Sequence, residues 1–154
     1  MMGVFDKIIS LLKSSGVSYE LLEHKPVYTS LDASSIRDTN LSMGAKALVF
    51  MADKKPILVV LPGDKKVDTS IFKKSFGIKD FRMASKEEVK EITSLEVGAI
   101  PPLGSALNLA SYFDEIFKEK DMIAFNAGSH TKSIKMKAAD LLDIEKPVFG
   151  NYAV

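Results

Sequence analysis

The sequence contains two apolar runs in close succession, AKALVFMA at residues 45–52 and PILVVL at residues 56–61. Only the polar stretch Asp53-Lys54-Lys55 separates them. Short apolar runs rich in β-branched residues and joined by a few polar residues are typical of a β-hairpin. Successive side chains of a strand point to opposite faces, and both faces of the first run are apolar except at Lys46. We therefore expect this strand to be buried on both sides.

Shorter helices and strands are predicted on both sides of the hairpin. Helical periodicity, capping residues and glycine stops place helices at about residues 4–12, 30–37, 69–76, 86–93 and 138–142. Apolar runs place further strands at about residues 17–21, 81–84, 107–113, 122–127 and 133–137. Because these elements do not alternate regularly, the sequence favours a mixed α/β (α+β) fold, with a mixed sheet surrounded by helices, over a doubly wound fold. The length of 154 residues fits a single domain over residues 1–154.

The composition excludes several classes of protein. The 21 Lys and Arg residues nearly cancel the 20 Asp and Glu residues, so bulk charge does not hold this chain on nucleic acid. Lysines nonetheless recur in pairs, at residues 54–55, 65–66 and 73–74, and the sequence leaves open whether these pairs share one face. The longest apolar runs fall far short of the roughly 18 residues of a membrane span, so we expect a cytoplasmic protein without membrane association.

Several chemistries lack the residues that they need. The chain has no cysteine, and its two histidines, His24 and His130, do not form an HExxH motif, so we expect neither a metal site nor a cofactor. GxGxxG, P-loop and GxSxG motifs are also absent. Hydride transfer, nucleotide hydrolysis and acyl transfer through a serine or thiol nucleophile are therefore unsupported.

Lys46 is the most informative single residue. Lysine is almost never fully buried unless it is paired, so a lysine inside an apolar strand needs an explanation. One reading is that Lys46 lies near the start of the strand and extends to water. The other is that it is a functional lysine in a pocket, and its spacing does not choose between the two.

Two loops are further candidates for a site. In residues 98–104, the glycines let a ligand approach the backbone, successive N–H groups can stabilise an oxyanion, and Pro101 and Pro102 add rigidity. The alternative reading is a stiff surface turn. In the second loop, Gly128-Ser129-His130, the histidine could act as a base or a donor, although a lone loop histidine, like His24, is more often only solvated.

Taken together and in this order, these segments resemble the YbaK/prolyl-tRNA-synthetase-associated domain family, whose members are free-standing or inserted aminoacyl-tRNA deacylases. The resemblance covers about residues 5–143. The matching segments are HKPVYTS at residues 24–30, GAKALVF at 44–50, VVLPGDKKVD at 59–68, GAIPPLG at 98–104 and AGSH at 127–130.

The resemblance implies both a fold and a site. The fold is a compact α/β domain around a strongly curved, mostly antiparallel mixed sheet. The site is a pocket that holds the 3′-terminal adenosine of a tRNA and the amino acid esterified to it. The residues implied in catalysis are Lys46, Gly98, Ala99 and Ile100, and those implied in substrate binding are His24, Pro101, Pro102, Gly128, Ser129 and His130.

The implied reaction is hydrolysis of the ester of a small amino acid, alanine or cysteine by resemblance, mischarged on a tRNA such as tRNA(Pro). Water or a group of the substrate would attack. Lys46 would orient the ester, N–H groups near Gly98 to Ile100 would polarise its carbonyl, and Pro101 and Pro102 would shape the amino-acid pocket. A synthetase pocket built for proline cannot strongly exclude smaller side chains, because one methylene is worth only about 1–3 kcal/mol.

Two alternative functions stay open. The first is a non-catalytic module of the same fold that binds tRNA or a synthetase such as prolyl-tRNA synthetase. The second is a hydrolase of another small acyl ester, which would act without a tRNA.

Overall fold

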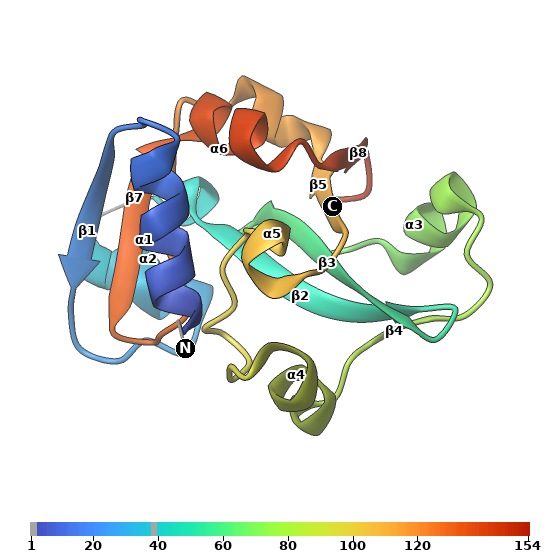
Figure 1. Cartoon of the computed structure of the whole chain (residues 1–154). Coiled ribbons are helices and arrows are strands. Elements are labelled where there is room, and N and C mark those ends of the chain that lie inside the picture. The colour runs from blue at the N-terminus through green and yellow to red at the C-terminus, as the bar shows by residue number, and fades with distance from the viewer. Residues whose placement is uncertain (1–2, 38–39) are drawn as a thin grey trace.

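The structure is a computed structural model that describes residues 3–37 and 40–154 (Figure 1). Its elements, in chain order, are α1 (Val4–Ser14), β1 (Tyr19–Glu23), α2 (Ser30–Arg37), η1 (Leu41–Met43), β2 (Ala45–Ala52), β3 (Lys55–Pro62), α3 (Thr69–Phe76), β4 (Phe81–Met83), α4 (Lys86–Thr93), α5 (Gly104–Leu107), β5 (Ser111–Asp114), η2 (Glu115–Glu119), β6 (Met122–Asn126), β7 (Lys132–Lys137), α6 (Ala138–Glu145) and β8 (Val148–Gly150). Within the described ranges, no helix is long and apolar enough to cross a membrane.

The predicted hairpin is confirmed as β2 and β3, which pair antiparallel from Ala45 opposite Pro62 to Ala52 opposite Lys55. The connection is tighter than expected, because Lys55 belongs to β3 and only Asp53 and Lys54 form the turn. Both turn residues have positive φ, 47° and 72°. This conformation matches the twist of two antiparallel strands, which is why two-residue hairpin turns favour it.

The strands form two sheets. One has the order β4-β2-β3-β5-β8, in which β3, β5 and β8 run parallel, and the other is the antiparallel sheet β1-β7-β6. The expected mixed and mostly antiparallel pairing is confirmed, but the expected single, strongly curved sheet is wrong. A lone bridge between Gly44 and Ala124 joins the two sheets. Side chains of the two sheets also pack against each other, with Ala47 and Val49 in the same core as Phe125.

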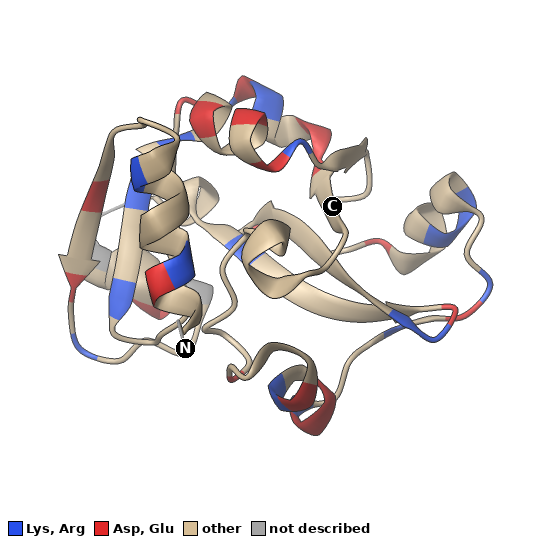
Figure 2. Cartoon of the chain, in the orientation of Figure 1, with Lys and Arg blue, Asp and Glu red and all other residues tan. Residues whose placement is uncertain are grey.

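The hairpin is buried on both faces, as its sequence predicts. Val49, Leu58 and Val60 belong to a core shared with α1, α5, α6 and the three-stranded sheet. Phe50 and Val59 belong to a second core, which α3 and the C-terminal segment cover. Charged residues in β2 and β3 are confined to Lys46 and to the end near the turn, as Figure 2 shows.

Local capping signals also gave correct helix limits. The Ser85 hydroxyl and the Glu88 side chain form a capping box at the start of α4. Asp68 caps α3, which ends at Gly77 in the left-handed conformation, and Thr29 Oγ1 accepts the N–H of Asp32 at the start of α2. Each cap satisfies an N–H group that has no partner within its own helix.

Residues 107–113 were expected to form one strand, and this is wrong at its start. The chain makes the short helix α5 over Gly104–Leu107, and β5 begins only at Ser111. Asn108, at φ 56°, ends α5 in the left-handed conformation. Gly104 is packed so closely that a Cβ there would collide with the carbonyl oxygen of Leu109. This tertiary packing overrides the apolar pattern of the segment.

A buried carboxylate anchors the C-terminal segment. Asp114, only 4% exposed, accepts the N–H of Ile116 through Oδ1 at 2.9 Å, and those of Tyr152 and Ala153 through Oδ2 at 2.9 and 2.8 Å. The phenol of Tyr152 donates to the carbonyl of Val60 at 2.6 Å. Burial, aided by the charge of Asp114, raises the pKa of Tyr152, so its phenol stays protonated as a donor.

We expect Asp114→Ala to lower the free energy of unfolding by about 3 kcal/mol, because it leaves buried N–H groups without an acceptor. Urea denaturation measures this loss. Asp121→Ala, at an exposed position, is the control and should change stability by no more than about 0.5 kcal/mol. Equal effects of the two substitutions would show that Asp114 does not anchor the segment.

Candidate functional site

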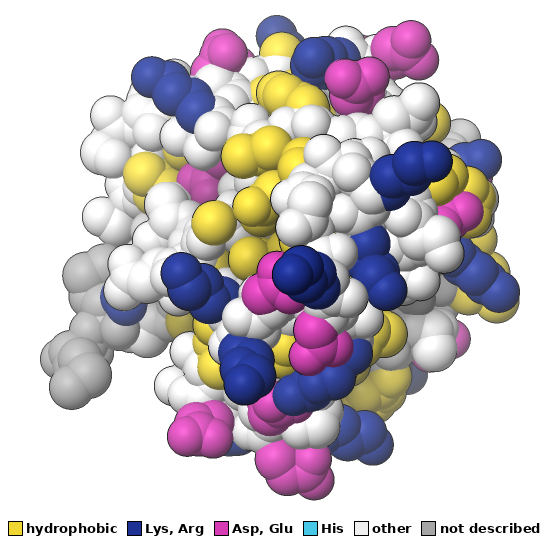
Figure 3. Space-filling view, turned by 90° about the vertical axis from the view of Figure 1, so that its right-hand side faces the viewer, with side chains coloured by type: hydrophobic (Ala, Val, Ile, Leu, Met, Phe, Trp, Pro, Cys, Tyr) yellow, Lys and Arg dark blue, Asp and Glu magenta, His cyan; other side chains and the backbone are white. Residues whose placement is uncertain are grey.

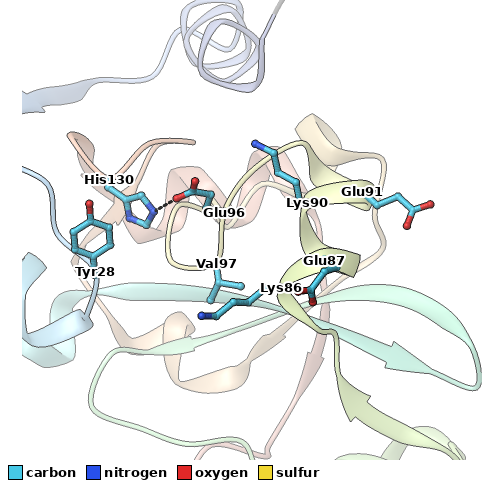
Figure 4. A pocket seen from close by; sticks show the side chains of 8 residues that line it. All are labelled: Tyr28, Lys86, Glu87, Lys90, Glu91, Glu96, Val97 and His130. Carbon is cyan, nitrogen blue, oxygen red and sulfur yellow. Dashed lines mark ion pairs between the residues drawn. The ribbon is translucent and has the colours of Figure 1, made fainter.

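Two adjoining cavities lie at the end of β2 where Lys46 is found. The smaller, which we call the Lys46 pocket, has a volume of about 170 Å³. The larger, which we call the His130 groove, has a volume of about 800 Å³ and runs between His130 and α4 (Figure 4). Tyr28 and Val97 line both cavities and form the boundary between them.

Four segments that are distant in the sequence meet in the Lys46 pocket. They are the segment before α2 with Tyr28 and Thr29, the start of β2, the loop after α4, and Asn126 at the end of β6. The bridge between Gly44 and Ala124 is parallel, so Lys46 and Asn126 follow it by two residues each and arrive side by side. Strand pairing therefore brings the lysine and the amide to one place.

Lys46 is half-buried and lines the pocket. The pKa of Lys46 lies below its ordinary value, chiefly because burial disfavours the charged form. The negative charge of Asp64 raises the pKa in part, and the positive charge of Lys66 lowers it. An ammonium group that has lost part of its water interacts more strongly with an anionic or carbonyl oxygen brought beside it. Lys46 thus presents a partly dehydrated ammonium group to the pocket.

Gly98 is required at its position by both conformation and space. Its φ is +91°, and a Cβ there would lie 3.1 Å from Cε1 of His130 and 3.5 Å from the carbonyl oxygen of Tyr28. The side-chain amide of Asn126 donates to the carbonyl of Gly98 at 2.6 Å. This hydrogen bond fixes the orientation of the peptide that follows Gly98.

The remainder of the glycine–proline loop has a supporting position. Ala99 is buried, and its N–H, expected to face a substrate, donates instead to the carbonyl of Glu96 at 3.0 Å within the same loop. Among the described residues, the N–H groups of Gly98 and Ile100 have no such partner. Pro101 and Pro102, expected to shape the amino-acid pocket, are buried and line neither cavity.

His130 forms one wall of the groove. Its Nδ1–H donates to the carbonyl of Val27 at 2.8 Å, which fixes the tautomer of the neutral ring, and the N–H of Val27 donates to the carbonyl of His130 at 2.9 Å. The ring lies 4.6 Å from that of Tyr28, and Nε2 lies 3.4 Å from Oε2 of Glu96. Figure 4 shows the imidazole between Tyr28 and Glu96. Nε2 is buried without a hydrogen-bond partner among the described residues.

Three other residues expected in the site lie outside both cavities. His24 is bonded through Nδ1 to the carbonyl of Lys25 and through Nε2 to the Ser133 hydroxyl, both at 2.7 Å, so it ties β1 to β7. Gly128, at φ +79°, packs against α1. Ser129 Oγ accepts the N–H of Thr131 at 3.1 Å within the same turn. These residues support the loop that carries His130.

Sequence reasoning missed several residues that line the cavities. Tyr28 and Thr29 belong to the segment at residues 24–30, but no feature of the sequence assigned them a role in the site. Glu96 and Val97 lie directly before the segment at residues 98–104 and also line a cavity. Asn126 could have been noticed as the polar residue that ends an apolar strand. Its position beside Lys46 depends on the bridge between the sheets, for which the local sequence has no signal.

Comparison with known proteins decides the family. The family model described as "Aminoacyl-tRNA editing domain" matches residues 24–144. The chain belongs to the aminoacyl-tRNA editing domain family. The matched region contains both Lys46 and His130, so the two cavities lie within the editing domain.

Two relatives match this chain over most of their own length. The multifunctional Ser/Thr-tRNA deacylase ProXp-y of Escherichia coli (strain K12) is 35% identical over 95% of this chain and 90% of its own. The prolyl-tRNA editing protein ProX of Acetoanaerobium sticklandii is 26% identical over 90% of this chain and 88% of its own. A solved structure described as a candidate trans-editing enzyme for prolyl tRNA synthetase has a TM-score of 0.85 over 100% of this chain and 99% of that chain. At 20% sequence identity, this likeness shows the shared fold.

We expect Gly98→Ala to lower stability by about 2–3 kcal/mol, since it adds both backbone strain and a contact that displaces His130. Gly77→Ala is a matched control, because Gly77 also has positive φ, at +65°, but a Cβ there meets nothing within 4 Å. The control should lose only about 1 kcal/mol. Urea denaturation measures both losses, and NMR signals of the His130 ring should move only in Gly98→Ala. Equal losses with unmoved signals would contradict the described packing.

Proposed function

We propose that this editing domain hydrolyses, in trans, the ester between a small amino acid and the 3′-terminal adenosine of a tRNA. The observation that carries the proposal is the meeting of Lys46 with the loop of Gly98 in one small pocket, beside a larger groove. Family membership supports the reaction, and the names of the two relatives support an aminoacyl-tRNA as the substrate.

The sizes of the cavities suggest which part of the substrate each one holds. Pockets that take drug-sized ligands have volumes of about 300–1,000 Å³. The His130 groove, at about 800 Å³, is within this range and can take the adenosine, with the exposed ring of Tyr28 as a stacking surface. The Lys46 pocket, at about 170 Å³, is suited to the aminoacyl group. The ester would then lie at the boundary, beside Tyr28 and Val97.

The residues of the pocket suggest a mechanism without a covalent enzyme intermediate. Water, activated directly or through a hydroxyl of the substrate ribose, attacks the ester carbonyl. The bond between the carbonyl carbon and the ribose oxygen breaks, and that oxygen takes a proton as it leaves. N–H groups of Gly98 and Ile100 stabilise the oxyanion, while Lys46 orients the ester and opposes the negative charge that develops. Asn126 holds the carbonyl of Gly98, which fixes the stretch of the loop between these two N–H groups.

The amino acid is small, and hydroxyl-bearing side chains suit the lining best. The pocket has the Thr29 hydroxyl, the Asn126 amide and the Lys46 ammonium among apolar residues such as Ala33 and Ala47. A site that can bond a hydroxyl group favours serine or threonine over an analogue without one. The name of the 35% identical relative supports the same pair. Alanine or cysteine on tRNA(Pro) is the second candidate, favoured by the apolar lining and by the name of the prolyl-tRNA editing relative.

A deacylation panel tests the proposal. The protein is incubated with Ser-, Thr-, Ala-, Cys- and Pro-tRNA, each on tRNA(Pro) and on its own tRNA, beside two variants. Lys46→Met should lose at least about 100-fold in kcat/KM, the size of effect expected when one group that stabilises the transition state is removed. Lys66→Met is the matched control, because Lys66 is an exposed lysine that acts on Lys46 only through its charge, and it should retain most activity.

Stability separates a chemical role of Lys46 from a structural one. Because its pKa is lowered on folding, charged Lys46 opposes folding at neutral pH, and this cost fades as the pH rises from its folded pKa toward 10.5. Lys46→Met should therefore be at least as stable as wild type at pH 7. Full activity in Lys46→Met would overturn the proposed role. No turnover of any substrate by the folded wild-type protein would favour the binding-module alternative.

A further inference from the structure

The charge of this chain is distributed unevenly. The chain has 21 basic and 20 acidic side chains. Residues 53–82 hold eight of the basic and four of the acidic side chains, so the rest of the chain has 13 basic and 16 acidic ones. The segment is thus net positive by four charges in a chain whose remainder is net negative by three. It comprises the turn of the β2–β3 hairpin, all of β3, α3 and most of β4.

Folding brings five of these lysines to one end of the molecule. Lys54 and Lys55 lie at the hairpin turn, Lys73 and Lys74 lie in the last turn of α3, and Lys79 lies in the loop that follows. We call these five residues the lysine tip. Backbone hydrogen bonds join its segments, since the N–H of Ile78 donates to the carbonyl of Lys73 at 2.9 Å and the N–H of Asp53 to that of Asp80 at 2.7 Å.

The five lysines of the tip outnumber the two acidic residues of the same segments, Asp53 and Asp80. All five lysines are exposed, and none forms an ion pair with another described residue. The Asp53 carboxylate accepts the N–H groups of Lys79 and Asp80 at 3.1 and 2.8 Å, and Asp68 caps α3. Figure 2 shows basic residues on α3 and at the hairpin tip, and Figure 3 faces this end of the molecule.

The tip also has a fixed spacing from the candidate site. β2 runs from Lys46 at one end to the turn at the other, and seven residues of extended strand span roughly 23 Å. This is less than the roughly 34 Å of one turn of a double helix. A nucleic acid whose single-stranded 3′ end reaches Lys46 would therefore have the phosphates of its adjoining duplex within reach of the tip.

We propose that the lysine tip binds the phosphate backbone of the duplex stem next to the 3′ end of the tRNA. This inference rests on the proposed function and adds a second point of contact for the same substrate. Exposed lysines that have no ion-pair partner can neutralise the phosphates of a nucleic acid. Interfaces between proteins, by contrast, are depleted in lysine. The chemistry of the tip therefore favours an RNA stem over a protein partner such as a synthetase.

Binding of uncharged tRNA tests the proposal without requiring hydrolysis. The variant Lys73→Gln/Lys74→Gln/Lys79→Gln is compared with Lys13→Gln/Lys137→Gln/Lys146→Gln, which removes the same charge from exposed lysines elsewhere on the molecule. At low salt the tip variant should bind about tenfold more weakly, and the slope of log K against log salt should shrink by about two to three, since each phosphate contact contributes about 0.7–0.9. The control variant should follow the wild type.

Hydrolysis provides the second readout. For aminoacyl-tRNA the tip variant should show a KM raised by a similar factor at unchanged kcat, and for an aminoacyl ester on a short 3′ oligonucleotide without a stem it should equal wild type. Equal tRNA binding by the tip and control variants, or an equal loss on both substrates, would overturn the proposal. So would a tip variant that keeps tRNA binding but loses binding to prolyl-tRNA synthetase. If the wild type hydrolyses neither substrate yet binds tRNA through the tip, only the proposed function fails.

Discussion

The β2–β3 hairpin is shielded from water on both faces, and this constraint positions the other elements. Leu58, Val59, Val60 and Leu61 have no exposed surface, and fully burying such side chains stabilises a fold by about 1.5–3 kcal/mol each. One face requires the cover of α1, α5, α6 and the three-stranded sheet, and the other requires α3 and the C-terminal segment. Lys46 lies where β2 emerges from this double cover, so it can be charged and still be partly dehydrated.

The candidate site depends on contacts between segments that are far apart in the chain. The bridge between Gly44 and Ala124 brings Asn126 beside Lys46, and the bond from Asn126 holds Gly98. The pairing of Val27 with His130 sets Tyr28 against the imidazole. Gly98 and Tyr28 are thus each held by a contact with another segment, and such rigidity favours the proposed oxyanion site.

The parts of the fold that the sequence predicted are those with local causes. The hairpin follows from two apolar runs and a short turn, and α3 and α4 follow from their caps at Asp68 and Ser85. The three-residue strand β8 is too short to have a periodicity, and α5 forms because of packing around Gly104. The division into two sheets depends on side-chain packing between strands that are distant in the chain.

The same distinction applies to the site. Lys46 was identifiable because a lysine in an apolar strand is an anomaly, and Gly98 because glycine and proline together mark an unusual loop. The sequence could not show that His24 and Ala99 use their polar groups inside the fold. His24 is hydrogen-bonded to Ser133, and the N–H of Ala99 donates to the carbonyl of Glu96. The lysine pairs were visible in the sequence, but only the hydrogen bonds of Asp53 and of Ile78 show that three segments form one tip.

The central claim is that the aminoacyl group occupies the Lys46 pocket while the adenosine occupies the His130 groove. Its most direct test is a crystal structure with a non-hydrolysable analogue, in which an amide joins serine to the 3′ position of adenosine. The account predicts the seryl group within hydrogen-bond distance of Lys46, its carbonyl oxygen facing the N–H groups of Gly98 and Ile100, and the base against Tyr28. An analogue bound with its base in the Lys46 pocket, or with its carbonyl turned away from Gly98, would contradict it.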